Sequence, residues 1–536
     1  MDRIGNLVLP FSFSKNLLSY FFSGSRSVCT LNSVAGPAAS YRTLLSWIED
    51  QACDPVAVDE KADTITYFDN NQILARSWRV NYDNKAILSA ITTIVHFFPN
   101  TPTFLQENHH LSPRKWLYSQ SFNTLSSNLL SYLERFSDFF RYLRSSFIES
   151  RLQIILKQQK EGLTGATDFI QEAISRRKRV KEDEDTRSKS RIRYDPYDFV
   201  PHNHHGKPTI VMGNPVTTNP CSYDAVKEVL TNIKDSTTGG CRRWTVIGCD
   251  GLPYLIASRV IREHSDLQDI LLQPGLGHFE MNMTKAIIKL IWNVVGEDLA
   301  KMLGYRSPKA LQACMDANDH HKAFQFLEIL LFGTGDELLL PYVRQCLSTD
   351  GTPSAQGYFE WCCRVQDPNY KFLQEVIFTY TLSVYLFRAG VRRNNCEVIM
   401  AARLKFAPLY FGTNKYNYQQ IEVLDSLMRV CAPAEVSKFI NDNESLTQSG
   451  HPSKGEGCDF ILESRNKMTK KWLPPGAPKE KHWNQACRNL DKLEKVLHAG
   501  VVALIDAAGD LRLLHLRGEG EEVKDIEKDV EGCGEG

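Results

Sequence analysis

The chain has 536 residues, of which 42% are hydrophobic, 24% charged and 10% aromatic, a composition that excludes a mainly disordered, collagenous or coiled-coil protein. Sixty-three basic and sixty-three acidic side chains cancel, so any preference for nucleic acid must come from a local patch. No stretch of the sequence approaches about 18 unbroken apolar residues, so we expect no segment that spans a membrane and no membrane as a partner. At roughly 150 residues per domain, the length predicts about two to four domains.

Three segments have compositions that do not support a core. Residues 1–40 mix Leu and Phe with Ser and Lys and predict a poorly ordered leader. Residues 176–193 are rich in charge of both signs and predict an exposed linker, and residues 499–536 predict a C-terminal extension with an acidic tail. The linker begins with a short basic run that resembles a nuclear localisation signal and weakly favours a nuclear over a cytoplasmic location, although a solvated surface explains it equally well: Arg176, Arg177, Lys178 and Arg179.

Strand and helix patterns alternate on both sides of this linker. Within residues 41–175, the β-branched and aromatic run Thr64–Phe68 predicts a strand that ends at Asp69, because turn formers follow it, and helical spacing of Leu and Phe predicts one or two later helices. Within residues 194–280, three short apolar runs are separated by helical patterns. This alternation predicts an α/β core built from both segments.

The rest of the chain reads as helical. Residues 281–445 carry apolar side chains at helical spacing with almost no strand signal, which predicts an all-α insertion, and residues 446–498 predict closing helices that include Glu463. The expected fold is therefore an α/β core with a large all-α insertion, mostly helical overall.

Three carboxylates stand out by position. Asp69 follows one strand, Asp250 follows a strand apolar enough to be central, and Glu463 lies on a late helix. Acids at the ends of neighbouring strands, joined by one from a helix, can hold Mg²⁺ or Mn²⁺, which prefer oxygen ligands and assist phosphodiester chemistry. With 63 acids in the chain, turn, cap and surface roles remain the alternative.

Other side chains accompany these acids. His278 stands where a strand should pass into a helix and could orient or protonate a leaving group, or simply cap the helix. The late helix carries Asp459 on the face of Glu463 and continues into a basic strip with interleaved tryptophans, in which Lys467, Lys470 and Lys471 are candidate DNA contacts. A solvated helix pair with two core tryptophans explains the strip equally well.

Five sequence runs in this order resemble an uncharacterised eukaryotic domain-of-unknown-function family with the look of a mobile-element protein: DTITYFDNNQILARSW, RWTVIGCDGLPYLIASRVI, LLQPGLGHFEMNMTKAIIKLIW, RAGVRRNN and SGHPSKGEGCDFILESRNKMTKKWLPPG. The family's layout is similar to that of ribonuclease H-like, three-acid transposases. The resemblance covers about residues 41–497 and implies a ribonuclease H-like mixed sheet, catalytic and metal-binding roles for Asp69, Asp250 and Glu463, an accessory role for His278, and Mg²⁺ or Mn²⁺ as cofactor.

Two departures from the family pattern matter. Relatives often have an acidic residue two positions before the histidine, where this chain has Leu276, and no Cys/His finger precedes the core. Two hypotheses follow. The first is a metal-dependent nuclease or strand transferase acting on DNA, alone or as an oligomer. The second is a non-catalytic descendant that uses its helical insertion to bind DNA or protein; a helical scaffold unrelated to transposition is a third reading.

Overall fold

The computed structural model describes residues 10–508 except 53–57, 76–86, 102, 109–110, 161, 163–167, 176–177, 179–196, 198, 205, 239–240 and 474–477. The predicted linker, apart from Lys178, and the acidic tail therefore lie outside the described residues. Within the described part, no helix is long and apolar enough to cross a lipid bilayer.

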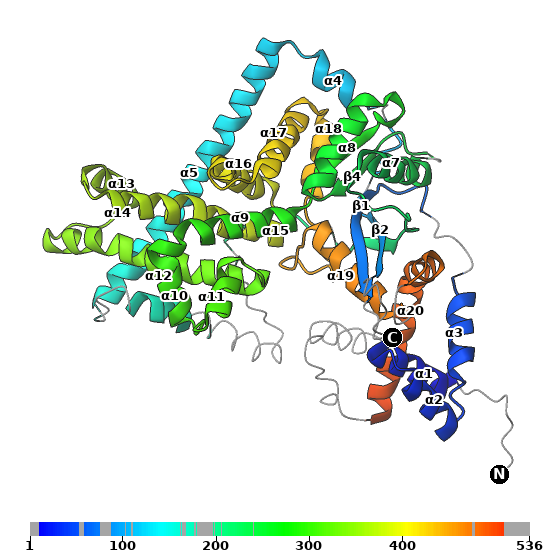
Figure 1. Cartoon of the computed structure of the whole chain (residues 1–536). Helices are drawn as coiled ribbons and strands as arrows, with labels where there is room; N and C mark the ends of the chain where they lie inside the picture. Colours follow the sequence, from blue (N-terminus) through cyan, green and yellow to red (C-terminus); the bar gives the residue numbers. More distant parts are fainter. Residues whose placement is uncertain are drawn as a thin grey trace, which may run out of the picture.

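A single mixed sheet of five strands organises the chain (Figure 1). The strands are β1 (Ile65–Ala75), β2 (Ile87–Phe98), β3 (Thr209–Met212), β4 (Thr245–Cys249) and β5 (Ile270–Pro274), in the spatial order β3-β2-β1-β4-β5. β2 is antiparallel to β1 and β3, whereas β1, β4 and β5 run parallel to one another. The α/β part of the expected fold is confirmed at this level.

The prediction that the first strand ends at Asp69, which rested on the turn-forming residues after it, is wrong. β1 continues to Ala75, and Asp69 lies opposite Thr93 of β2 in the antiparallel ladder. The ladder to β2 supplies backbone partners throughout this stretch, which outweighs the weak strand propensity of Asp and Asn. On the β4 side, however, the parallel ladder stops at Tyr67. Asp69 therefore lies just past the end of the β1–β4 pairing.

Alternate side chains of the strands enter two different cores. Phe68, Ile94 and Ile247 pack with the helices α7 (Tyr223–Thr238) and α8 (Gly251–Glu263). Tyr67, Val95 and Val246 pack on the other face, with α19 (Cys458–Lys471) and α20 (Glu480–Ala508). Burial on both faces follows the two-residue period of a strand, so the sheet lies between two groups of helices.

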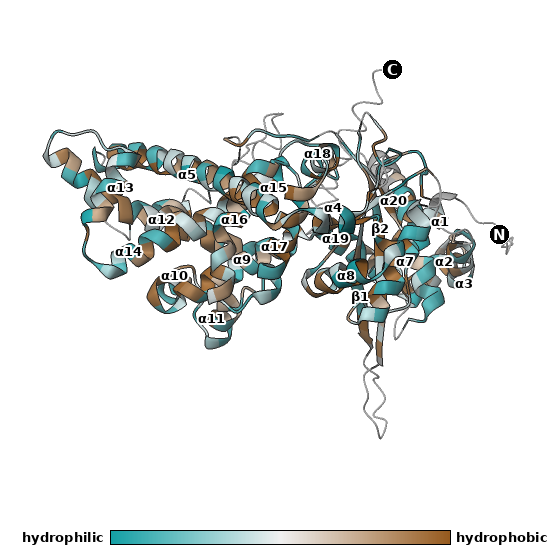
Figure 2. Ribbon diagram, turned by 90° about the horizontal axis from the view of Figure 1, so that it is seen from above, coloured by the Kyte–Doolittle hydropathy of each residue, from teal (hydrophilic) through white to brown (hydrophobic). Residues whose placement is uncertain are grey.

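The remaining helices form an elongated block beside the sheet, as Figures 1 and 2 show. Every described element from 276 to 442 is helical: α9 (Leu276–Ile291), η2 (Trp292–Gly296), α10 (Glu297–Met302), α11 (Pro308–Met315), α12 (His320–Ser348), α13 (Ala355–Arg364), α14 (Pro368–Glu375), η3 (Val376–Thr381), α15 (Leu382–Arg393), α16 (Cys396–Gly412), α17 (Tyr416–Cys431) and α18 (Ala434–Asp442). The long helix α5 (Phe122–Lys160), preceded by α4 (Pro113–Ser119), packs against α12 and α16. The chain is mostly helical, as expected.

Residues 10–35 differ from the poorly ordered leader that the composition suggested. They form α1 (Pro10–Ser23) and α2 (Arg26–Ala35), followed by α3 (Tyr41–Asp50). Leu17 and Phe21 of α1 are buried, and the Phe21 ring lies 5.0 Å from that of Trp472. The Leu and Phe residues thus form one face of a helix that packs onto the C-terminal helices, a contact that composition alone does not reveal.

A buried ionic network joins α16, α17 and the segment that leads into α19. Asp425 accepts a hydrogen bond from Arg429 at 3.0 Å and forms an ion pair with Arg403 at 2.9 Å, while Glu422 pairs with Arg403 and Glu444 with Arg429. All five side chains are buried. Charges removed from water are tolerated only when each is paired, so the network fixes how these helices meet.

Replacing Asp425 by Ala should lower the free energy of unfolding by roughly 3–5 kcal/mol, because two buried guanidinium groups lose their shared partner. Chemical denaturation of the full chain measures this loss. Lys438→Ala, which breaks the exposed pair with Asp442, should cost less than about 1 kcal/mol. Equal effects of the two substitutions would show that the buried network does not carry the stability assigned to it.

Candidate active site

Two of the predicted acids meet at one edge of the sheet. Ile65 pairs with Val246 and Tyr67 with Gly248, so two further residues along each strand place Asp69 level with Asp250. Because side chains alternate along a strand, Asp69 lies on the same face as Tyr67, the face that α19 covers. Asp250 directly follows β4 and precedes the first residue of α8. The parallel register therefore brings both carboxylates to the side of α19.

His278 and Glu463 complete this group. His278 lies in the first turn of α9, just after β5, and its Nδ1 atom is 2.9 Å from Asp250 Oδ1. Its Nε2 atom is 3.6 Å from Glu463 Oε1 on α19. The structure thus brings together Asp250, His278 and Glu463, with Asp69 beside them. The catalytic and metal-binding roles given to these residues remain predictions.

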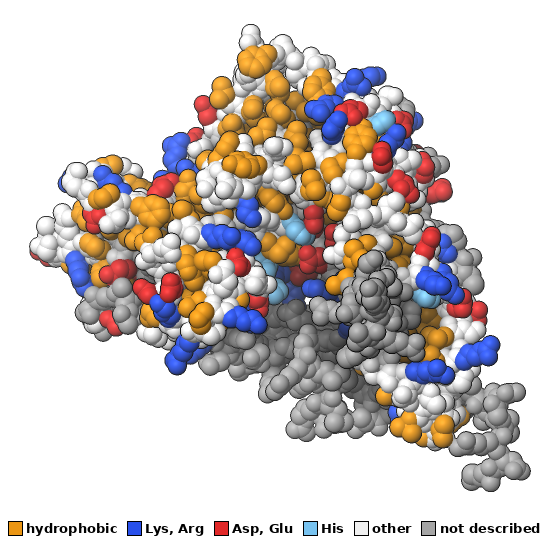
Figure 3. Space-filling view, viewed as in Figure 1, with side chains coloured by type: hydrophobic (Ala, Val, Ile, Leu, Met, Phe, Trp, Pro, Cys, Tyr) orange, Lys and Arg blue, Asp and Glu red, His pale blue; other side chains and the backbone are white. Residues whose placement is uncertain are grey.

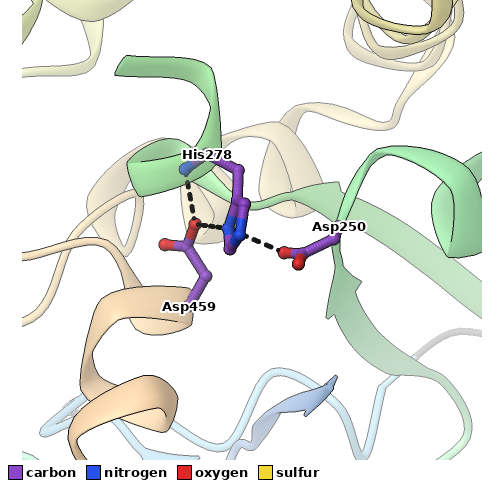
Figure 4. Close-up of side chains that lie close together, drawn as sticks. All are labelled: Asp250, His278 and Asp459. Atoms are coloured by element: carbon purple, nitrogen blue, oxygen red, sulfur yellow. Dashed lines mark hydrogen bonds and ion pairs between the residues drawn. The ribbon is translucent and has the colours of Figure 1, made fainter. Parts of the chain in front are cut away.

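A further carboxylate, Asp459, belongs to the same cluster (Figure 4). Its Oδ2 atom accepts a hydrogen bond from the backbone N–H of His278 at 2.9 Å and lies 3.0 Å from the imidazole Nδ1 atom. Its Oδ1 atom accepts the backbone N–H of Gly277 at 3.0 Å. The sequence places Asp459 on the same helix face as Glu463 but assigns it no role. The spacing of four residues between this carboxylate and a candidate catalytic acid was the sequence signal that could have identified it.

The cluster is accessible from solvent. Figure 3 shows acidic and histidine side chains gathered near the middle of the face seen in Figure 1. The side chain of Glu463 is 33% exposed and those of Asp250 and His278 are 24% and 22% exposed, whereas that of Asp459 is only 4% exposed. The first three can therefore meet a bound molecule, while Asp459 stands behind them.

Crowding of like charges shifts the pKa values of these groups. Burial and the neighbouring Asp250 raise the pKa of Asp69 to about 7, against the opposing effects of His278 and the Asn70 N–H group. Burial also raises the pKa of Glu463, which His278 partly offsets. Two of the three predicted acids are thus harder to ionise than ordinary carboxyls, which is expected where carboxylates share a site without a cation.

His278 supplies positive charge to the cluster. Burial alone would disfavour the charged imidazolium, but hydrogen bonds to Asp250 and Asp459 outweigh it and raise the pKa of His278 to about 11. The same contacts lower the pKa of Asp459, although its burial acts in the opposite direction. At neutral pH the site therefore contains an imidazolium paired with the ionised carboxylate of Asp459.

Among the described residues, the side chains close enough to share one metal ion are not the predicted set of Asp69, Asp250 and Glu463. Ligand atoms of Asp250, His278 and Asp459 lie within 4.8 Å of one another, but both oxygens of Asp459 already accept backbone N–H groups. Asp69, Asp250 and Glu463 offer less committed carboxylate oxygens, the ligands that Mg²⁺ and Mn²⁺ prefer. Burial raises the pKa values of both Asp69 and Glu463, and neighbouring carboxylates raise them further.

The predicted basic strip divides into exposed and buried parts. Lys467, Lys470 and Lys471 are exposed on α19, and Lys471 also lies 4.6 Å from the Phe21 ring centroid. Trp472 and Trp483, in contrast, are buried in the core. Stacking of nucleic-acid bases on these tryptophans is therefore excluded, and the alternative of two core tryptophans is the correct one.

No family model matches the chain, and no curated protein matches it. Among solved structures, it is similar to one described as "Drosophila P element transposase strand transfer complex", with a TM-score of 0.40 and 9% sequence identity over 91% of this chain and 93% of that chain. At this level of likeness, the chemistry of the site must follow from its own residues. Membership in the domain-of-unknown-function family stays a prediction.

Asp69→Asn should stabilise the protein without added metal at pH 8. Because folding raises the pKa of Asp69 from 3.8 to about 7, its ionisation penalises the folded state above pH 7, and this penalty disappears below about pH 4. We expect a gain of roughly 1–3 kcal/mol at pH 8 that shrinks toward pH 4. Thermal unfolding across this range measures it; a variant less stable than the native chain at pH 8 would contradict the crowding.

Proposed function

We propose that this chain is a transposase-derived protein that cleaves or joins DNA phosphodiester bonds with the help of a divalent cation. The observation that carries the proposal is the meeting of Asp69, Asp250 and Glu463 around His278, from two adjacent strands and a helix that lies about 200 residues further along the chain. Acids distant in sequence that converge in a partly exposed site point to a catalytic rather than a capping role.

The architecture supports the ribonuclease H-like part of the proposal. A mixed five-stranded sheet carries the first two acids, and the helical block from α9 to α18 separates β5 from α19, which carries the last acid. This agrees with the layout that the family resemblance implies: two strand-end acids, a helical insertion, and a helix with a final Glu.

In this proposal each side chain has a distinct task. Asp69, Asp250 and Glu463 would hold Mg²⁺ or Mn²⁺, which would activate the attacking oxygen and stabilise charge on the phosphate. His278 keeps Asp250 and Glu463 in place through its two ring nitrogens. Because His278 is partly exposed and its Nε2 atom lies 3.6 Å from Glu463 Oε1, the Nε2–H group can also donate to a phosphate oxygen or a leaving oxygen that enters the site.

Exposed lysines on α19 support DNA as the substrate. The helix begins beside the acidic cluster and ends in Lys470 and Lys471, with Lys467 one turn from Glu463. Lysines that follow the reactive group along one helix can neutralise phosphates on either side of a scissile bond.

A second candidate is the non-catalytic descendant, and one observation favours it. The imidazolium of His278 already neutralises charge in the acidic cluster, so the site can be electrostatically satisfied without any metal. The protein would then keep the fold and bind partners through its helical block. Metal binding by the purified chain separates the two candidates.

Asp250→Asn should abolish metal-dependent cleavage or joining of DNA while leaving the protein folded, since the amide cannot replace a charged metal ligand. Single-turnover assays with Mg²⁺ and Mn²⁺, together with calorimetric metal titration, measure both effects. Asp269→Asn is the control, because Asp269 pairs with Lys234 next to the opposite end of β5. Full metal-dependent activity of Asp250→Asn would rule out this site.

Lys467→Ala and Lys470→Ala should weaken binding of DNA regardless of its sequence. Each substitution removes one phosphate contact and should reduce the slope of log K against log salt by about 0.9. Binding measured by fluorescence anisotropy at several salt concentrations tests this, with Lys309→Ala on α11 as the control. Unchanged slopes for both α19 variants would place the DNA elsewhere.

A further inference from the structure

Asp459 is the most enclosed carboxylate of the cluster, and its contacts all run to one turn of the chain. It accepts the backbone N–H groups of Gly277 and His278 and lies against the imidazole of His278. In effect, a side chain from α19 caps the N-terminus of α9, whose first backbone N–H groups have no partner within their own helix. The positive end of the α9 dipole also favours a carboxylate there.

The backbone is built for this close approach. A Cβ atom on Gly275 would come within 2.6 Å of Asp459 Oδ2, and one on Gly457 would collide with Asp459 Oδ1. A Cβ atom on Gly277 would lie 2.5 Å from the ring of Phe460, the residue next to Asp459. Glycine at these three positions lets α9 and α19 meet directly through Asp459.

The contact decides where the imidazole points. Nδ1 of His278 is shared between Asp459 and Asp250, which leaves Nε2 directed toward Glu463. Asp459 contacts both the backbone N–H group and the ring of His278. Rotation of the His278 side chain would therefore break at least one hydrogen bond. The residue two positions before His278 is Leu276, which is buried and apolar, so α19 supplies the carboxylate that the neighbouring sequence lacks.

We propose that Asp459 is a positioning residue, which holds His278 in the orientation that links Asp250 to Glu463. This inference rests on the proposed function for its effect on catalysis, but its effect on His278 is independent of any activity. Outer carboxylates that orient a functional histidine typically change metal affinity or activity by 10- to 100-fold when they are replaced.

Asp459→Asn tests the proposal. An amide has only one oxygen, so one of the N–H groups that now point at Asp459 would face an NH₂ group. Asp63→Asn is a matched control. Asp63 is equally buried and accepts the backbone N–H groups of Leu105, at 3.1 Å, and Gln106, at 2.8 Å, but it lies before the start of β1, at the opposite edge of the sheet.

Both substitutions should lower the thermal midpoint to a similar extent, because each leaves a buried donor without an acceptor. Only Asp459→Asn should shift the low-field imidazole N–H proton resonance of His278, which His278→Gln identifies by its loss. Asp459→Asn should also reduce kcat for DNA cleavage by about 10- to 100-fold with little change in KM. An unchanged His278 resonance, or equal activity losses in both variants, would overturn the positioning role.

A second pair of variants leaves the carboxylate intact. Gly275→Ala should displace Asp459 and reproduce the shift of the His278 resonance, whereas Gly412→Ala, where an added Cβ meets nothing within 4 Å, should not. A native His278 resonance in Gly275→Ala would contradict the proposal. If the native chain cleaves no DNA with Mg²⁺ or Mn²⁺, the proposed function fails, while the resonance measurements still decide whether Asp459 positions His278.

Discussion

Repulsion among carboxylates on one face of the sheet is the constraint to which the rest of the site responds. The parallel register of β1 and β4 brings Asp69 level with Asp250, and α19 adds Asp459 and Glu463 from the same side. Burial and the neighbouring Asp250 together raise the pKa of Asp69, so these acids oppose one another's ionisation. The fold tolerates the cluster because α9 places His278, and the positive end of its own helix, in the middle of it.

The sequence could predict the strands and the first two acids because the signals are local. A buried parallel strand is a short apolar run, and the residue after it stands at the sheet edge, so Asp250 could be recognised from WTVIGCD alone. The helical character of residues 281–440 is local in the same sense. The end of β1 was misjudged because the antiparallel ladder to β2, a non-local contact, carries the strand through Asp69, Asn70 and Asn71.

The role of Asp459 could not be predicted for the opposite reason. It depends on two helices that start 182 residues apart, Leu276 and Cys458, meeting end to end, and on glycines at 275, 277 and 457 that permit the approach. In the sequence, these glycines look like ordinary loop residues. The helices α1 and α2 could not be predicted for the same reason, because Leu17 and Phe21 are buried only through contacts with the C-terminal helices.

The helical block is not a separate module attached to the site. Phe279, next to His278 on α9, lies 5.1 Å from the ring of Tyr418 on α17 and 4.4 Å below the guanidinium of Arg403 on α16. Arg403 in turn belongs to the buried ionic network that ends at Glu444, shortly before α19. The two helices that carry His278 and Glu463 are thus both anchored by the block. The packing of α16 and α17 therefore helps to hold the acidic cluster at the sheet edge.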